Sequence, residues 1–235
     1  MKLSFSSILL LSLSSVAVAQ NATNLSSSLN FGTHYAVLNL DLITALVSPL
    51  SATPAGSEFI SSVSRWIDAV HALPSRPLTI FTRIFFSNAR RPEVGPNAPF
   101  AKTIAGLGNA TADNPITEVF PAFTVDEAGG DVVLQKARFY AGAGNALEEI
   151  LKTQGIDTVI LSGIRTSGVI LSTAYHLFDL DYKVYVIANN TIESPPDTPG
   201  INDAILAGII PKLPANVITL DQALAAIARS GPAVY

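Results

Sequence analysis

The segment Gly155–Phe178 constrains the fold most, because a buried strand and a helix follow each other directly in it. The run Thr158–Gly163 is short, apolar and rich in β-branched residues, which is typical of a strand covered on both faces of a parallel sheet. Ile164–Gly168 predicts a turn, and the pattern from Val169 onward predicts a helix. Open α/β sheets bind ligands beyond the carboxyl ends of such strands, so we expect functional residues at this turn.

Similar apolar runs alternate with helical patterns along the rest of the chain. Strands are expected at Tyr35–Leu40, Leu78–Phe85, Asp131–Leu134, Thr158–Gly163, Lys183–Ile187 and Asn216–Thr219. Helices are expected at Phe59–Ala72, Asn145–Gln154, Val169–Asp179, Ile201–Ile210 and Asp221–Arg229. This alternation predicts right-handed βαβ units, and therefore an α/β fold: a single-domain, Rossmann-like three-layer sandwich with a mostly parallel sheet of about six strands.

Local signals predict how some of these elements begin and end. Asn145 has the position of a helix cap, Glu148 the spacing of a capping box, and Gly155 the position just after a helix end. The Pro-, Gly- and Asn-rich stretch Asn88–Ala128 predicts a long insertion over the mouth of a site, where specificity is commonly carried.

The N-terminus resembles a secretory leader. Met1-Lys2 gives a positive start, Ile8–Leu11 begins an apolar stretch, and Ala17-Val-Ala19 fits a small-residue cleavage site. We therefore expect a signal peptide over residues 1–19, a flexible arm over residues 20–30, and one domain over residues 31–235 of a secreted protein. Glycosylation sequons accord with export and lie at Asn21, Asn24, Asn109 and Asn189.

Composition limits the classes of binding partner that can be expected. The formal net charge is −4 and the longest basic run is Arg90-Arg91, so nothing favours binding to nucleic acid or to a membrane surface. We expect a small-molecule substrate, and a homo-oligomer stays open. The pair Gly142 and Gly144 lacks the third glycine of a dinucleotide fingerprint, so no cofactor is predicted. The histidines show no metal-ligand spacing, so no metal is predicted; they are His34, His71 and His176.

Two charged residues follow predicted strands. Asp41 stands directly after Tyr35–Leu40, where an acid is unexpected from packing alone, and it could cap a helix beginning at Leu42 or act in catalysis. Lys136 follows the third predicted strand, where a lysine is commonly solvated, although a catalytic role is open.

These residues and the turn after the fourth strand together resemble the isochorismatase-like hydrolases, also called the cysteine hydrolase superfamily. That family has an aspartate after its first strand, a lysine after its third, and the motif G-[VI]-x-T-x-x-C-V after its fourth. The last motif reads Gly163-Ile-Arg-Thr-Ser-Gly-Val-Ile170 here, which puts Val169 at the cysteine position of a chain without cysteine. The resemblance implies catalysis by Asp41 and Lys136, and a cis peptide bond between Ile164 and Arg165. It also implies a substrate-binding segment formed by Ile164, Arg165, Ser167, Gly168 and Val169.

The missing thiol limits the function that the resemblance implies. Amide-hydrolysing relatives need the cysteine, whereas true isochorismatases cleave a vinyl ether by protonating carbon, which a carboxylic acid with a raised pKa can do. Ser167 or Thr166 has no adjacent base for nucleophilic attack, and Ser167 is expected to cap the following helix. We expect a secreted hydrolase of an isochorismate-type enol ether using Asp41. The alternatives are a tailoring enzyme of secondary metabolism and a catalytically inactive binding protein.

Overall fold

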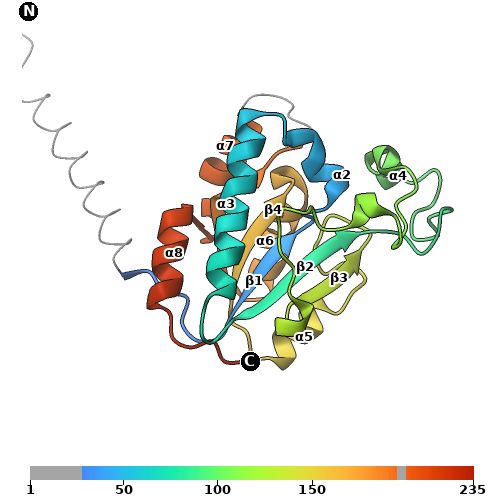
Figure 1. The fold of residues 1–235 in the computed structure, drawn as a ribbon. Coiled ribbons are helices and arrows are strands. Elements are labelled where there is room, and N and C mark those ends of the chain that lie inside the picture. The colour runs from blue at the N-terminus through green and yellow to red at the C-terminus, as the bar shows by residue number, and fades with distance from the viewer. Residues whose placement is uncertain (1–27, 195–199) are drawn as a thin grey trace, which may run out of the picture.

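A computed structural model describes residues 28–194 and 200–235, and these form one domain around a single sheet (Figure 1). Its six strands lie in the order β3-β2-β1-β4-β5-β6, and every neighbouring pair is parallel. In chain order the strands are β1 (Tyr35–Leu40), β2 (Leu78–Ile84), β3 (Val132–Lys136), β4 (Thr158–Ile164), β5 (Lys183–Ile192) and β6 (Asn216–Ile218). The expectations for the leader and for Asn21 and Asn24 fall outside the described residues.

The register of the central strands places their carboxyl ends at the same edge of the sheet. β1 and β4 are buried at every position, as expected for central strands of a parallel sheet. Leu40 at the end of β1 lies beside Thr82 of β2 and Gly163 of β4. Lys136 at the end of β3 lies beside Ile84 of β2. Side chains that follow these strands therefore meet at one edge of the sheet.

Helices cover both faces of the sheet and complete the three-layer sandwich that the sequence predicts. On one face α3 (Pro54–His71) and α8 (Leu220–Arg229) pack over the side chains of Tyr35 and Val37 (Figure 1). On the other face α5 (Leu147–Thr153) and α6 (Leu171–Asp179) pack over the alternate side chains of β1. Short helices α2 (Thr44–Val47), α4 (Pro99–Thr103) and α7 (Ile201–Asp203) lie in the connections.

Two elements extend further than the sequence pattern predicts. The helix α3 begins at Pro54, because the Thr53 side chain accepts a hydrogen bond from the backbone N–H of Gly56 and Pro54 suits the first helical position. The strand β5 continues to Ile192, which brings the next residue, Glu193, up to the end of β4.

The start of α5 differs from the prediction. The residue at the N-cap position is Ala146. Asn145, one residue earlier, accepts a hydrogen bond from the N–H of Leu147 at the start of the helix, and its side-chain amide donates to the carbonyls of Gln135 and Ala141. Glu148 accepts a hydrogen bond from the hydroxyl of Tyr140, so the predicted capping box is wrong. The predicted end is confirmed, because Gly155 follows the helix with a left-handed φ of 64°.

The insertion Asn88–Ala128 takes part in a small apolar cluster. Val94, Ile104 and Ala110 of the insertion are buried together with Phe86, which follows β2, and Ile84 of β2 packs against them. Figure 1 shows α4 standing beyond the upper ends of β2 and β3. The insertion is thus placed to wall in whatever lies at that edge of the sheet.

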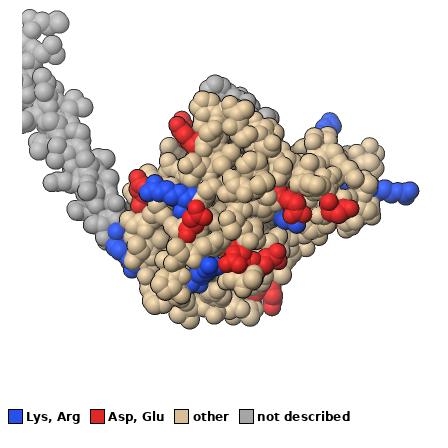
Figure 2. Space-filling view, in the orientation of Figure 1, with Lys and Arg blue, Asp and Glu red and all other residues tan. Residues whose placement is uncertain are grey.

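The face of the molecule drawn in Figure 2 shows no cluster of basic side chains. On the face in Figure 2, basic side chains are scattered among acidic ones and wide uncharged areas. No helix within residues 28–194 and 200–235 is long and apolar enough to cross a bilayer.

Candidate active site

Asp41 and Lys136 form a buried ion pair at the carboxyl edge of the sheet. Lys136 Nζ lies 2.6 Å from Asp41 Oδ2, with the lysine side chain wholly buried and the aspartate side chain 4% exposed. The two residues are far apart in the sequence, and they meet because β1, β2 and β3 end at the same edge of the sheet. The sequence-predicted catalytic pair is therefore one physical unit.

Asp41 is held by the neighbouring strand and does not cap a helix. Its backbone is left-handed, with φ 58°, and its N–H donates to the carbonyl oxygen and to Oγ1 of Thr82. The Thr82 hydroxyl in turn donates to Asp41 Oδ1 at 2.7 Å. The next helix, α2, begins only at Thr44, and its N-cap is Ile43 without a side-chain hydrogen bond. The alternative that Asp41 is a helix cap is therefore excluded.

Lys136 is fixed from a second direction by the loop that follows it. Its Nζ donates to the carbonyl oxygen of Phe139 at 2.7 Å. One ammonium group thus joins the strand end, the loop after β3 and the Asp41 carboxylate.

Burial changes the proton affinity of both partners. It raises the pKa of Asp41 above its usual value, against the attraction of Lys136 and hydrogen bonds from Lys136 and Thr82. It lowers the pKa of Lys136, against the attraction of Asp41. The free energies of the charged and neutral forms of the pair are thereby brought closer together. A carboxyl group of this kind can take up and release a proton during a reaction.

The segment after β4 contributes three of its five predicted binding residues to a cavity beside Asp41. The peptide bond between Ile164 and Arg165 is cis, as expected. Ile164, Arg165 and Val169 line the cavity. Gly168 does not line it, but a side chain there would collide with Phe139 and Arg165, so the absence of a side chain allows this loop to pack closely.

Ser167 plays a different part from the one predicted. Its N–H donates to Glu193 Oε2 at 2.8 Å and its hydroxyl donates to Glu193 Oε1 at 2.9 Å. It does not cap the following helix: one turn of π-helix spans Thr166–Ile170 ahead of α6, and the residue before it, Arg165, makes no capping bond. The prediction of a Ser167 cap is wrong, and so is the prediction that this hydroxyl has no adjacent base, because the Glu193 carboxylate that follows β5 lies beside it.

The cavity beside Asp41 is small and mostly apolar. Its volume is about 60 Å³, room for only a few water molecules. The insertion closes one side of it, as expected, through Phe100, Thr103, Ile104 and Leu107. The remaining lining residues are Leu46, Ile84, Arg138 and Phe139.

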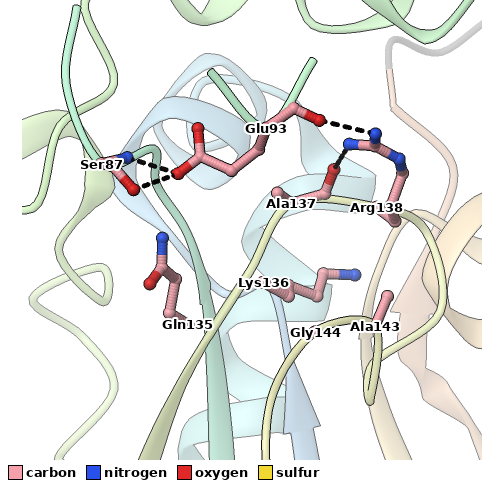
Figure 3. A pocket seen from close by; sticks show the side chains of 8 residues that line it. All are labelled: Ser87, Glu93, Gln135, Lys136, Ala137, Arg138, Ala143 and Gly144. Carbon is pink, nitrogen blue, oxygen red and sulfur yellow. Dashed lines mark hydrogen bonds between the residues drawn. The ribbon is translucent and has the colours of Figure 1, made fainter. Parts of the chain in front are cut away.

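A second, more polar hollow of about 460 Å³ adjoins the first and is drawn in Figure 3. Arg138 lines both hollows. In Figure 3 the Glu93 carboxylate is held by Ser87 on one side of the hollow, and Arg138 lies on the other. Lys136 and Gln135 form part of the floor between them. Arg138 is therefore the common wall between an apolar cavity and a polar one.

Sequence reasoning missed four residues that shape the site: Thr82, Arg138, Phe139 and Glu193. Thr82 lies inside a predicted strand and only the register with β1 reveals it. Glu193 could have been suspected as a charged residue after an apolar strand, had the length of β5 been recognised. No group of three or more histidine, cysteine or acidic residues in the described part of the chain could hold a metal ion.

A family model decides the classification. The isochorismatase domain matches residues 35–209, which include Asp41, Lys136 and the segment after β4. The chain belongs to the isochorismatase family. Comparison with curated proteins gives no significant match. Val169 departs from the cysteine of the cysteine hydrolases, so this isochorismatase family member lacks the family thiol.

Solved structures of the family share the fold at low sequence identity. An isochorismatase family protein from Burkholderia thailandensis is 23% identical with a TM-score of 0.69, over 85% of this chain and 98% of its own. A cysteine hydrolase from Pseudomonas syringae pv. phaseolicola is 17% identical with a TM-score of 0.70, over 83% and 92%. The N-carbamoylsarcosine amidase from Thermoplasma acidophilum is 20% identical with a TM-score of 0.62, over 80% and 98%. The family thus contains hydrolases.

Proposed function

We propose that this isochorismatase family member is a hydrolase that uses Asp41 as a non-covalent acid/base catalyst on a small enol ether of the isochorismate type. The observation that carries the proposal is the buried Asp41 carboxyl, with a raised pKa, beside a cavity that offers no thiol. A covalent acyl-enzyme is not favoured, because neither Ser167 nor Thr166 lines that cavity, although the Ser167 hydroxyl donates to the Glu193 carboxylate.

The proposed reaction needs one proton and one water molecule. Protonated Asp41 gives its proton to the terminal carbon of the C=C–O group, and the ether carbon becomes an oxocarbenium ion. Water adds to that carbon, and the Asp41 carboxylate takes back a proton. The hemiketal that forms then separates into a carbonyl compound and an alcohol, so Asp41 is regenerated in each cycle.

The surroundings of Asp41 support this chemistry. Ile164 and Val169 exclude water from the carboxyl group, which favours its neutral form. Thr82 and Lys136 each donate to one carboxylate oxygen and hold it in place. Since the cavity is about 60 Å³, it suits small open-chain enol ethers, and a ring of isochorismate size requires the wall formed by α4 to move.

Two features of the site also fit a binding protein. The tight cavity and the valine at the thiol position are also compatible with a binding protein that has lost catalysis. A tailoring reaction of secondary metabolism would use the same proton transfer at Asp41. The alternatives can be told apart by two outcomes: whether a proton is transferred to a carbon of the ligand, and whether water is added to it.

Hydrolysis in deuterium oxide tests the proposal. We expect the carbonyl product of an enol ether to carry one deuterium on the carbon that was protonated, because the Asp41 proton exchanges with solvent. Product deuteration is measured by mass spectrometry with simple vinyl ethers and isochorismate, and small amides serve as controls. Turnover of the amides alone, or of no substrate, would contradict the proposed function.

We also propose that the protein is secreted and glycosylated. The leader pattern supports export, and the side chains of Asn109 and Asn189 are exposed. Protein recovered from the medium should begin near Gln20 on N-terminal sequencing. Secreted protein that still begins with Met1 would contradict cleavage of the leader.

A further inference from the structure

Three cations surround Asp41, and they differ in how their charges are balanced. Lys136 is paired with Asp41 itself. Arg165 and Arg138 both line the cavity, on opposite parts of the fold: one follows β4 and the other follows β3. The charge that a substrate meets depends on which of these two guanidinium groups already has a carboxylate partner.

Arg165 has a built-in counter-ion. Its Nε lies 3.7 Å from Glu193 Oε1, and the Glu193 side chain is only 9% exposed. The same carboxylate is held by the N–H and hydroxyl of Ser167, so its position is fixed. A buried carboxylate so close to Arg165 cancels most of the attraction that this arginine would exert on an anion in the cavity.

Arg138 has no such partner. Its guanidinium donates to the carbonyl oxygens of Ala137 and Glu93 and lies over the Phe100 ring at 5.0 Å. Within the described residues it forms no ion pair. Glu93 has a pKa below its usual value, because hydrogen bonds from Ser87 outweigh the effect of burial, with a small contribution from Arg138. That carboxylate is thus engaged mainly by Ser87.

We infer that Arg138 determines specificity by selecting a substrate with a negatively charged group, whereas Arg165 does not attract that group because Glu193 balances it. This inference rests on the proposed function and adds the substrate class: a small, mostly apolar molecule that carries a carboxylate. The apolar walls hold its carbon skeleton beside Asp41, and its charged group lies at the Arg138 side, where the cavity meets the polar hollow of Figure 3.

Propionate and propionamide test this inference, because they have nearly the same shape and differ by one charge. Their dissociation constants are measured by NMR titration of the wild-type protein, which needs no turnover. We expect propionate to bind more tightly, and the preference to fall as salt is added, because Arg138 is exposed. Equal binding of the two probes, or binding of neither, would overturn the inference even if enol ethers are hydrolysed.

Substitutions test whether the preference for propionate over propionamide comes from Arg138. Arg138→Met should reduce the propionate-to-propionamide preference roughly fivefold, a modest effect because the guanidinium is solvated. Arg90→Met removes an exposed arginine of the insertion and should leave the preference unchanged. Glu193→Gln should strengthen propionate binding, because it releases the charge of Arg165.

The neutral probe separates charge recognition from structural damage, since Arg138 also fastens the insertion. A merely structural role would weaken both probes alike in Arg138→Met and leave their ratio unchanged. That outcome, or an unchanged propionate affinity, would overturn the inference.

Discussion

Replacing Asp41 with asparagine should lower turnover by roughly 10²–10⁴-fold and change substrate binding little. The side chains have the same shape, and the amide oxygen can accept from Lys136 while the amide nitrogen donates to the Thr82 hydroxyl. Asparagine cannot carry the proton that the proposed reaction moves. The expected result is therefore a fall in kcat with a nearly unchanged KM, measured by steady-state kinetics.

The control for this substitution is Asp179→Asn, which removes an exposed acid from the end of α6. It should match the wild type in both constants. Circular dichroism and thermal unfolding establish that both variants are folded. If Asp41→Asn retained wild-type kcat in a folded protein, the acid/base role of Asp41 would be lost.

Replacing Lys136 with methionine should destabilise the protein by about 3–5 kcal/mol, because the substitution leaves a buried carboxylate without its counter-ion. Methionine fills a similar volume, so the loss is mainly electrostatic. Only the Thr82 hydroxyl would remain as a side-chain donor to Asp41. The free energy of unfolding is measured by urea denaturation. The double variant Asp41→Asn/Lys136→Met should recover most of the loss.

The pH dependence of Lys136→Met has a defined sign. Burial raises the folded-state pKa of Asp41, and removing Lys136 removes the opposing attraction, so the pKa rises further. The folded state then binds more protons than the unfolded state, whose Asp pKa is about 3.9. The stability penalty is absent below that pH and grows as the pH rises through the folded-state pKa. Destabilisation that is the same at every pH would indicate a packing defect instead.

The sequence could predict the sheet and the meeting of Asp41 with Lys136, because both depend on simple regularities. Runs such as Tyr35–Leu40 and Thr158–Gly163 are buried on both faces, and parallel strands end at the same edge. The partners of the pair could not be predicted in the same way. Thr82 and the Phe139 carbonyl depend on register and on loop geometry, which no local pattern specifies.

The errors at Asn145 and Ser167 have a common physical cause. Both residues are of types that commonly cap helices, and both form hydrogen bonds with other segments of the chain, although Asn145 also accepts one from Leu147 at the start of α5. Asn145 donates to Gln135 at the end of β3, and Ser167 donates to Glu193 after β5. Tertiary contacts outweighed the short-range preference of each residue, and in both places they fix a loop beside the site.

The apolar cluster at the insertion and the Asp41–Lys136 ion pair are held by different contacts. Phe86, Val94, Ile104 and Ala110 pack with one another, while the Asp41–Lys136 pair is held by the ends of the sheet. Substitutions at Phe100, Thr103, Ile104 and Leu107 should therefore change what enters the cavity and leave the Asp41–Lys136 ion pair in place. These four positions therefore offer protein engineers, and evolution, a way to change ligand preference without disturbing the ends of the sheet.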